Sequence, residues 1–202
     1  MTDTAAPDLR ERRRMATRSE ISDAALTLFE AQGYDGTTIE DIAHAAGVSS
    51  RTCFRYFSNK IELVLTAAEA MNEAITEWLD APDREAPLLD QLLDVYESIV
   101  SQVEATQEVT DQVLRVRRLM QNDASMRTAA LARDVERAWD LTQRITASFG
   151  AATTPLEISI ATEFAGATLR VAFDEWVREI ESGKPSHLIE NFRAVRSRVP
   201  VR

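Results

Sequence analysis

Residues 37–63 read TTIEDIAHAAGVSSRTCFRYFSNKIEL, and this stretch contains the local signals that decide the fold. Its first four residues have the pattern of a capping box, which predicts a short helix over about 38–45. Gly47 suits the left-handed backbone of a tight turn, and Ser49 is a typical N-cap for a second helix over about 50–56. Two short helices joined by a glycine-containing turn predict a helix-turn-helix, whose second helix enters the major groove of DNA.

The second of these helices has side chains suited to reading DNA. Cys53 and Phe57 lie four residues apart and are expected to face the core together, which leaves Arg51, Arg55 and Tyr56 on the outer face. Arg51 and Arg55 are also four residues apart, so both guanidinium groups can reach guanine edges. A structural helix of this length would need neither the two arginines nor the flanking hydroxyls.

The charge distribution agrees with DNA binding at the N-terminal end. The net charge of the chain is −10. Residues 1–60 contain 8 basic and 9 acidic side chains, whereas residues 61–202 contain 15 basic and 24 acidic ones. Nearly all of the excess negative charge therefore lies in the second part. Within residues 10–18, five arginines surround a single glutamate. Such a cluster is typical of an arm that contacts the DNA backbone, although a solvated, frayed terminus would have the same charges.

The rest of the chain is predicted to be helical. Apolar residues at helical spacing predict a helix over about 16–32 before the motif, and further helices after it. These further helices are expected at about 59–79, 87–104, 107–121, 124–149, 155–181 and 185–197.

The helix predicted over 155–181 is apolar on two faces, so both faces must be covered. One stripe begins at Leu156 and Ile160, and the other begins at Ile158 and Ala161. The small residues of the second stripe would allow close helix approach, which favours packing against a second copy of the chain; a buried central helix within a monomer is the alternative. The dimer interface is expected at Ile158, Ala161, Ala165, Leu169, Ala172, Trp176 and Phe192.

The composition argues against several classes of protein. One Cys and two His provide neither a disulfide framework nor a Cys/His zinc cluster. Catalytic triads and phosphate-binding glycine loops have no matching spacing in the sequence, so neither an enzyme nor a cofactor is expected. The sequence shows no secretory signal and no apolar run of about 18 residues, which predicts a cytoplasmic protein without a membrane partner. A helical interaction protein without DNA binding is the main alternative.

Residues 37–63 resemble the signature of TetR/AcrR-type regulators, through the opening TTIEDIA, the turn AGVS, the pair Tyr56-Phe57 and the following Lys60. The family often has Gly where this chain has Arg51, and Tyr where it has Phe54, so the phosphate contact of that tyrosine hydroxyl is not available here. The resemblance implies a nine-helix chain, a dimer formed by the last two long helices, and release of DNA when a ligand binds the C-terminal part.

The stretches 114–120 and 169–176 are similar to the C-terminal domain described in this family as binding acyl-CoA-like ligands. An apolar tunnel with arginine at its mouth would suit an acyl chain with a phosphate-bearing head. The other interpretation is that these apolar residues are ordinary core and that Arg115 and Arg118 pair with carboxylates. The ligand-binding residues are expected to be Met71, Ile75, Trp78, Tyr96, Val100, Val103, Arg115, Arg118, Met120, Trp139 and Phe173.

Together these features predict an all-α, TetR-like protein with an N-terminal DNA-binding domain over 1–60 and a ligand-binding and dimerisation bundle over 61–202. The expected function is a ligand-responsive repressor that binds a palindromic operator as a homodimer; a regulator with a ligand unrelated to acyl-CoA is the alternative. DNA contacts are expected from Arg13, Arg14, Arg18, Thr37, Thr38, Ser49, Ser50, Arg51, Thr52, Arg55, Tyr56 and Lys60.

Overall fold

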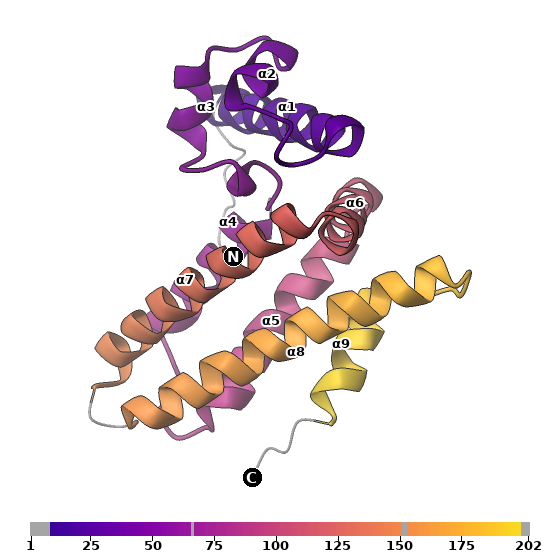
Figure 1. Cartoon of the computed structure of the whole chain (residues 1–202). Coiled ribbons are helices and arrows are strands. Elements are labelled where there is room, and N and C mark those ends of the chain that lie inside the picture. The colour runs from indigo at the N-terminus through magenta and orange to yellow at the C-terminus, as the bar shows by residue number, and fades with distance from the viewer. Residues whose placement is uncertain (1–8, 66, 151–152, 199–202) are drawn as a thin grey trace.

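The computed structural model describes residues 9–65, 67–150 and 153–198, which form nine α-helices, one short 3₁₀ helix and no strand (Figure 1). This confirms the predicted all-α fold. Among the described helices, none has the length and apolar character needed to span a bilayer. The elements are α1 (Leu9–Gln32), α2 (Ile39–Ala45), α3 (Ser50–Tyr56), η1 (Ile61–Leu63), α4 (Ala67–Asp80), α5 (Leu88–Glu104), α6 (Gln107–Asn122), α7 (Ala124–Phe149), α8 (Pro155–Glu181) and α9 (Leu188–Arg196).

Helices α1, α2 and α3 form a separate layer at one end of the molecule (Figure 1). Their apolar faces meet around Phe29, Ile42, Cys53 and Phe57, all of which are buried. The same buried cluster includes the three apolar residues at 61, 63 and 64, so the N-terminal unit extends slightly beyond the expected boundary at residue 60.

The bundle formed by α4 to α9 has its own core, in which α5, α8 and α9 pack against one another. Leu92, Trp176 and Phe192 are among its fully buried side chains. The start of α8 is fixed by a capping box: Thr154 N donates to the carboxylate of Glu157 (2.8 Å), and Glu157 N donates back to the Thr154 hydroxyl (3.3 Å).

Helices α6 and α7 connect the two units. Val116 and Met120 of α6, together with Met126 and Ala130 of α7, belong to the buried cluster of the N-terminal unit. Farther along the same helices, buried residues belong to the core of the bundle. Movement of α6 or α7 within the bundle would therefore be felt directly by the N-terminal unit.

The helix predicted over 59–79 is interrupted in the structure. Ile61 and Val64 pack in the N-terminal core, whereas Met71 and Ile75 pack in the bundle core. Because the chain passes from one core to the other between these pairs, a continuous helix could not serve both. Asn59 caps this turn as predicted, because its side-chain oxygen accepts a hydrogen bond from Glu62 N (3.1 Å). The reciprocal half of the predicted box is wrong, since the Glu62 carboxylate accepts from the Ser58 amide (3.1 Å) and hydroxyl (2.6 Å).

Two other local predictions are shifted. The first helix begins at Leu9 instead of about residue 16, so the arginine cluster is helical. The capping box of α2 lies one residue later than predicted: Thr38 is the N-cap, and its partner is Asp41 instead of Glu40. Hydrogen bonds from Thr38 lower the pKa of the Asp41 carboxyl, as expected for a capping carboxylate.

The predicted dimer interface on α8 is wrong. The six α8 residues named for it are buried against the chain's own helices, because α5 and α9 cover that face, and Phe192 of α9 is buried as well. The exposed apolar stripe is the opposite one, at Leu156, Ile160, Phe164 and Val171. The outer face is therefore the apolar face of α8 that the chain itself leaves uncovered.

Candidate DNA-binding and ligand-binding sites

The turn between α2 and α3 is held by short-range interactions. Gly47 has a φ of +66°, a conformation that L side chains rarely adopt, and Val48 N donates to Ala43 O across the turn (2.9 Å). Ser49 then caps α3 by accepting a hydrogen bond from Thr52 N (3.1 Å). These local contacts set the direction in which α3 leaves the turn.

The two faces of α3 divide as the sequence predicts. Cys53 and Phe57 are buried, and burial raises the pKa of the Cys53 thiol, as for an inert core residue. Arg51 and Arg55 are exposed on the outer face. The Arg55 guanidinium lies 4.9 Å from the ring centroid of Tyr56, which helps to hold it on this face.

Phe54 was not among the expected DNA contacts, yet it is 57% exposed between the two arginines of α3. Its ring is therefore accessible to a partner that contacts the outer face of α3. The helical register predicts this exposure, because Phe54 directly follows the buried Cys53 and therefore cannot point in the same inward direction.

Three of the expected DNA contacts are engaged inside the protein. Thr37 is buried, and its hydroxyl donates to Gly33 O (2.8 Å). Arg18 donates to Tyr56 O (3.2 Å) and lies over the Phe57 ring, so it ties α1 to the end of α3.

Lys60 is the third of these residues. Its amine donates to Tyr34 O (2.6 Å) and Thr37 O (3.0 Å) and lies 4.0 Å from the Tyr34 ring centroid. It therefore secures the connection between α1 and α2 instead of reaching outward.

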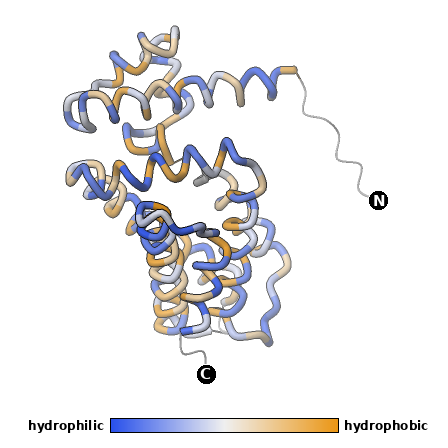
Figure 2. Tube along the Cα trace, turned by 90° about the vertical axis from the view of Figure 1, so that its right-hand side faces the viewer, coloured by the Kyte–Doolittle hydropathy of each residue, from blue (hydrophilic) through white to orange (hydrophobic). Residues whose placement is uncertain are grey.

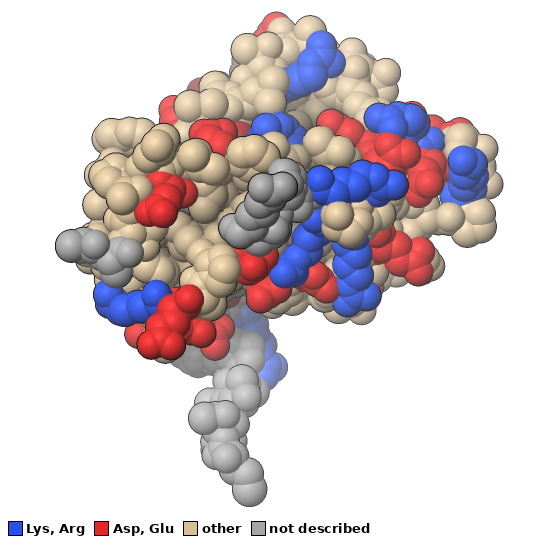
Figure 3. All heavy atoms as spheres, turned by 90° about the horizontal axis from the view of Figure 1, so that it is seen from below, with Lys and Arg blue, Asp and Glu red and all other residues tan. Residues whose placement is uncertain are grey.

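The remaining basic candidates lie on the first turns of α1. Arg13 and Arg14 are exposed there, and Figure 2 shows this part of α1 projecting beyond the other helices of the N-terminal unit. At the opposite end of the molecule, acidic and basic side chains alternate over one half of the surface, and uncharged residues dominate the other (Figure 3). A broad basic surface of the kind DNA requires is therefore not seen at that end.

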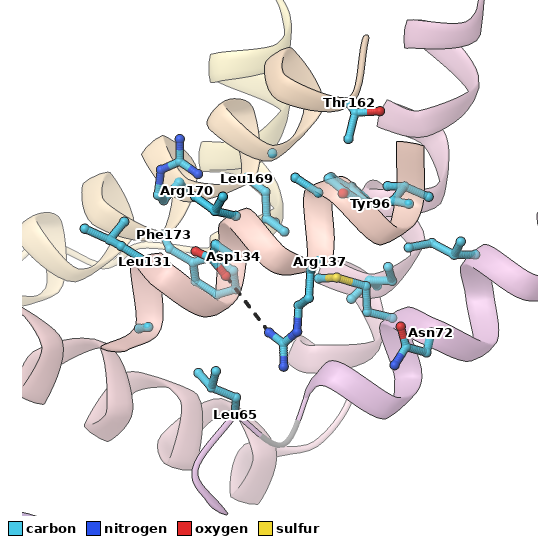
Figure 4. Close-up of a pocket in the computed structure, with 18 of the residues that line it drawn as sticks. Leu65, Asn72, Tyr96, Leu131, Asp134, Arg137, Thr162, Leu169, Arg170 and Phe173 are labelled. Carbon is cyan, nitrogen blue, oxygen red and sulfur yellow. Dashed lines mark ion pairs between the residues drawn. The ribbon is translucent and has the colours of Figure 1, made fainter. Parts of the chain in front are cut away.

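A cavity of about 290 Å³ lies inside the bundle, between α4, α5, α6, α7 and α8 (Figure 4). Most of its wall is apolar, from residues such as Ile75, Ile99, Val113 and Leu141. The space therefore suits a small, mainly apolar molecule.

The cavity also has a few polar groups. Tyr96 is buried, and burial together with nearby carboxylates raises the pKa of its phenol to about 12, so it is a neutral donor. Arg117 lies over the Phe173 ring, with 3.8 Å between its guanidinium carbon and the ring centroid. Arg137 reaches from α7 toward Leu65 and Asn72 and forms a long ion pair with Asp134 at 4.0 Å (Figure 4).

The structure brings together six of the eleven residues expected to bind ligand, and they line the cavity. The other five do not. Trp78 packs on Phe149 and donates a hydrogen bond to Gln91. Val100 is buried in the core but does not line the cavity. Trp139 of α7 is 70% exposed. The six that line the cavity are Met71, Ile75, Tyr96, Val103, Met120 and Phe173.

The other two of these five are the predicted arginines, which belong to surface ion pairs instead. Arg115 binds Glu30 of α1 (2.6 Å), and Arg118 lies 3.7 Å from Glu181. Arg117 lines the cavity in their place, because it shares a helix face with the buried Val113 and Val116, whereas its neighbours at 115 and 118 do not. This register could have identified Arg117 from the sequence.

In the part of the chain that the structure describes, no group of three or more His, Cys, Asp or Glu side chains could hold a metal ion. His44 and His187 are both exposed and far apart in the chain.

Comparison with known proteins identifies the N-terminal unit. Residues 21–67 match the family model for bacterial regulatory proteins of the tetR family. The transcriptional regulator TcmR of Streptomyces glaucescens is 46% identical over 83 residues, which cover 41% of this chain and 37% of TcmR. IcaR of Staphylococcus epidermidis, a negative transcriptional regulator of a biofilm operon, is 35% identical over 52 residues, which cover 26% of this chain and 28% of IcaR. The matched segments thus span only 37% and 28% of the length of these two relatives.

Among solved structures, the fold is similar to that of NalD from Pseudomonas aeruginosa, the secondary repressor of a multidrug efflux pump. The TM-score is 0.54 at 23% sequence identity, over 91% of this chain and 94% of NalD. At this level of identity the similarity supports the fold, including the arrangement of the bundle, and nothing about the ligand.

Proposed function

We propose that the chain is a transcriptional repressor of the TetR type controlled by a small ligand, on the premise that residues 21–67 match the tetR family model. In this proposal, a dimer binds a palindromic operator through α3 and leaves it when the cavity of each bundle is occupied. The observation that carries the proposal is the division of α3 into a buried anchor at Cys53 and Phe57 and an outer face with Arg51, Phe54 and Arg55.

This outer face has the chemistry for reading bases. The guanidinium groups of Arg51 and Arg55 can each donate two hydrogen bonds to a guanine edge, and the ring of Phe54 can contact a thymine methyl group. Phosphate contacts would come from residues around this face, which position the domain without selecting a sequence. The residues proposed for them are Arg13, Arg14, Thr38, Ser49, Ser50, Thr52 and Tyr56.

A second copy of the chain is proposed to cover the outer face of α8. Phe164 is 46% exposed there, within the stripe that begins at Leu156, and the neighbouring helix α7 exposes Val135 and Trp139. Several exposed apolar side chains on two helices that pack together are typical of an association site. Two-fold symmetry would then place two α3 helices on the same side of one duplex.

The cavity is proposed as the effector site. Val116, Met120 and Ala130 line it and at the same time belong to the buried cluster of the N-terminal unit. A ligand that displaces these side chains would alter the support beneath α1 to α3, so ligand and operator would weaken each other's binding. The acyl chain of an acyl-CoA would fit the apolar wall of the cavity, and its large head group would then lie outside.

The test is binding of the purified protein to fluorescent duplexes from the DNA upstream of its own gene, measured by anisotropy at two salt concentrations. We expect one duplex to be preferred over its scrambled sequence, and the preference to be reduced in Arg51→Ala and Arg55→Ala by about 1–3 kcal/mol each. Arg118→Ala, on the surface of the bundle, is the matched control. Equal losses on specific and scrambled DNA in the α3 variants would contradict base reading by these arginines.

A further inference from the structure

We infer that the effector of this cavity is an acid: a mainly apolar molecule with one negatively charged group, which Arg117 and Arg137 bind, and an oxygen atom that accepts a hydrogen bond from Tyr96. This inference rests on the function proposed above and specifies the chemical class of its ligand. A neutral or cationic molecule of the same size is predicted to bind more weakly.

Arg117 has unused hydrogen-bonding capacity. Its guanidinium lies over the Phe173 ring, but within residues 9–65, 67–150 and 153–198 no carboxylate lies at ion-pair distance and no hydrogen bond joins it to another group. A guanidinium has five N–H donors, so the donors of Arg117 are free to bind an acceptor atom of a ligand in the cavity. Burial lowers the pKa of Arg117, while Asp134 and Asp174 act in the opposite direction.

Arg137, which like Arg117 interacts with Asp134, also has unused hydrogen-bond donors. Its single ion pair, to Asp134 on the same helix, is long at 4.0 Å, and no described group accepts a hydrogen bond from its guanidinium. Burial and the neighbouring Arg133 lower its pKa. Figure 4 shows the guanidinium directed into the space beside Asn72.

The inner charges of the cavity therefore do not balance. The lining contains four arginines, at 117, 137, 144 and 170, but only three carboxylates, at 134, 140 and 163. Asp134 interacts electrostatically with both Arg117 and Arg137. Arg144, also in the lining, is held by the Thr76 hydroxyl (2.6 Å) and lies 4.0 Å from Asp140. One additional negative charge would pair the remaining guanidinium, whereas a cation would add a repulsive charge at the same place.

Tyr96 supplies a second, neutral point of recognition. Its hydroxyl has no hydrogen-bond partner in the described part of the chain, and with a pKa of about 12 it keeps its proton at physiological pH. It can therefore donate to a carbonyl or ether oxygen but does not favour a cation. The walls around these polar groups are apolar, which sets the character of the rest of the ligand.

The test uses three probes of equal chain length: decanoate, decanol and decylamine, each titrated into the full-length protein at pH 7 by calorimetry. We expect decanoate to bind at least about tenfold more tightly than decanol, since charge-assisted hydrogen bonds are the stronger ones, and decylamine to bind most weakly. Arg117→Gln and Arg137→Gln should each weaken decanoate by about tenfold and leave decanol nearly unchanged. Arg118→Gln, outside the cavity, is the matched control and should behave as wild type.

Decanol or decylamine binding as tightly as decanoate would overturn the inference, as would the absence of decanoate binding. The probe series on the wild-type protein gives this answer even if an arginine variant fails to fold. Operator binding by the same preparations separates the two proposals. Release of the operator by decanol alone would refute the acidic effector but leave the repressor intact, whereas loss of sequence-specific DNA binding would refute the repressor regardless of the ligand.

Discussion

Arg133 of α7 and Glu62 of η1 form an ion pair, with 2.5 Å between Nη2 and Oε1, that joins the C-terminal bundle to the N-terminal unit. Both side chains are largely buried, and Arg133 lies between Ala130 and Asp134, which line the cavity. Although burial opposes the ionisation of Glu62, hydrogen bonds from Ser58 and the charge of Arg133 outweigh it and lower its pKa. The carboxylate is therefore fully ionised at neutral pH and available to transmit a shift of α7.

A double-mutant cycle tests this link. Arg133→Gln, Glu62→Gln and the double variant should show a coupling of about 1 kcal/mol in the free energy of unfolding at pH 7, since the pair is only partly screened by solvent. Glu136→Gln removes the other, more exposed partner of Arg133 and serves as control, with coupling of a few tenths of a kcal/mol at most. Equal coupling for both partners would contradict a special role of the Glu62 pair.

Lys60→Met should destabilise the protein. The substitution removes the amine that donates to two carbonyl oxygens and contacts the Tyr34 ring. The free energy of unfolding, measured by urea denaturation, should therefore fall by about 1–3 kcal/mol. Arg51→Met, on the exposed face of α3, should change stability by less than about 0.5 kcal/mol. A stable Lys60→Met protein with uniformly weaker DNA binding would show that Lys60 contacts phosphates after all.

Two glycine substitutions should have opposite effects. Gly166 lies in α8 beside the cavity, and an added Cβ would meet no atom within 4 Å, so Gly166→Ala should raise the free energy of unfolding by about 0.5–1 kcal/mol. At Gly36 the added Cβ would lie 2.5 Å from the carbonyl oxygen of Gln32, so Gly36→Ala should be destabilising. Stabilisation by both changes would mean that the contact at Gly36 relaxes without cost.

Phe164→Glu should dissociate the proposed dimer. A carboxylate in the centre of the outer α8 stripe would be buried without a partner, and the dimer dissociation constant should rise by at least about tenfold, as measured by sedimentation. Val109→Glu, which changes a 36% exposed residue on α6, should leave the association unchanged. An undiminished dimer in Phe164→Glu would place the interface elsewhere.

The helix-turn-helix could be predicted from sequence because its signals are local. Gly47 and Ser49 determine the turn and the start of α3, and the spacing of Cys53 and Phe57 determines which face is buried. The bounds of α5 to α8 followed from apolar periodicity and caps in the same way.

Properties that depend on tertiary packing were not predicted correctly. Ala161 and Ala165 were assigned to a contact between two copies because they are small, but α5 and α9 of the same chain occupy that face. The periodicity of α8 shows two apolar stripes without indicating which one its own chain covers. The cavity is likewise a gap between five helices, and no local pattern encodes its shape.

The most direct test of the central claim is selection of bound sequences from random DNA duplexes by the full-length protein, followed by sequencing. A dimer reading DNA through α3 predicts an enriched inverted repeat, with half-site centres about 34–36 Å apart, one helical turn, or a multiple of this distance. Enrichment of a single, unrepeated site, or of no sequence at all, would contradict the account.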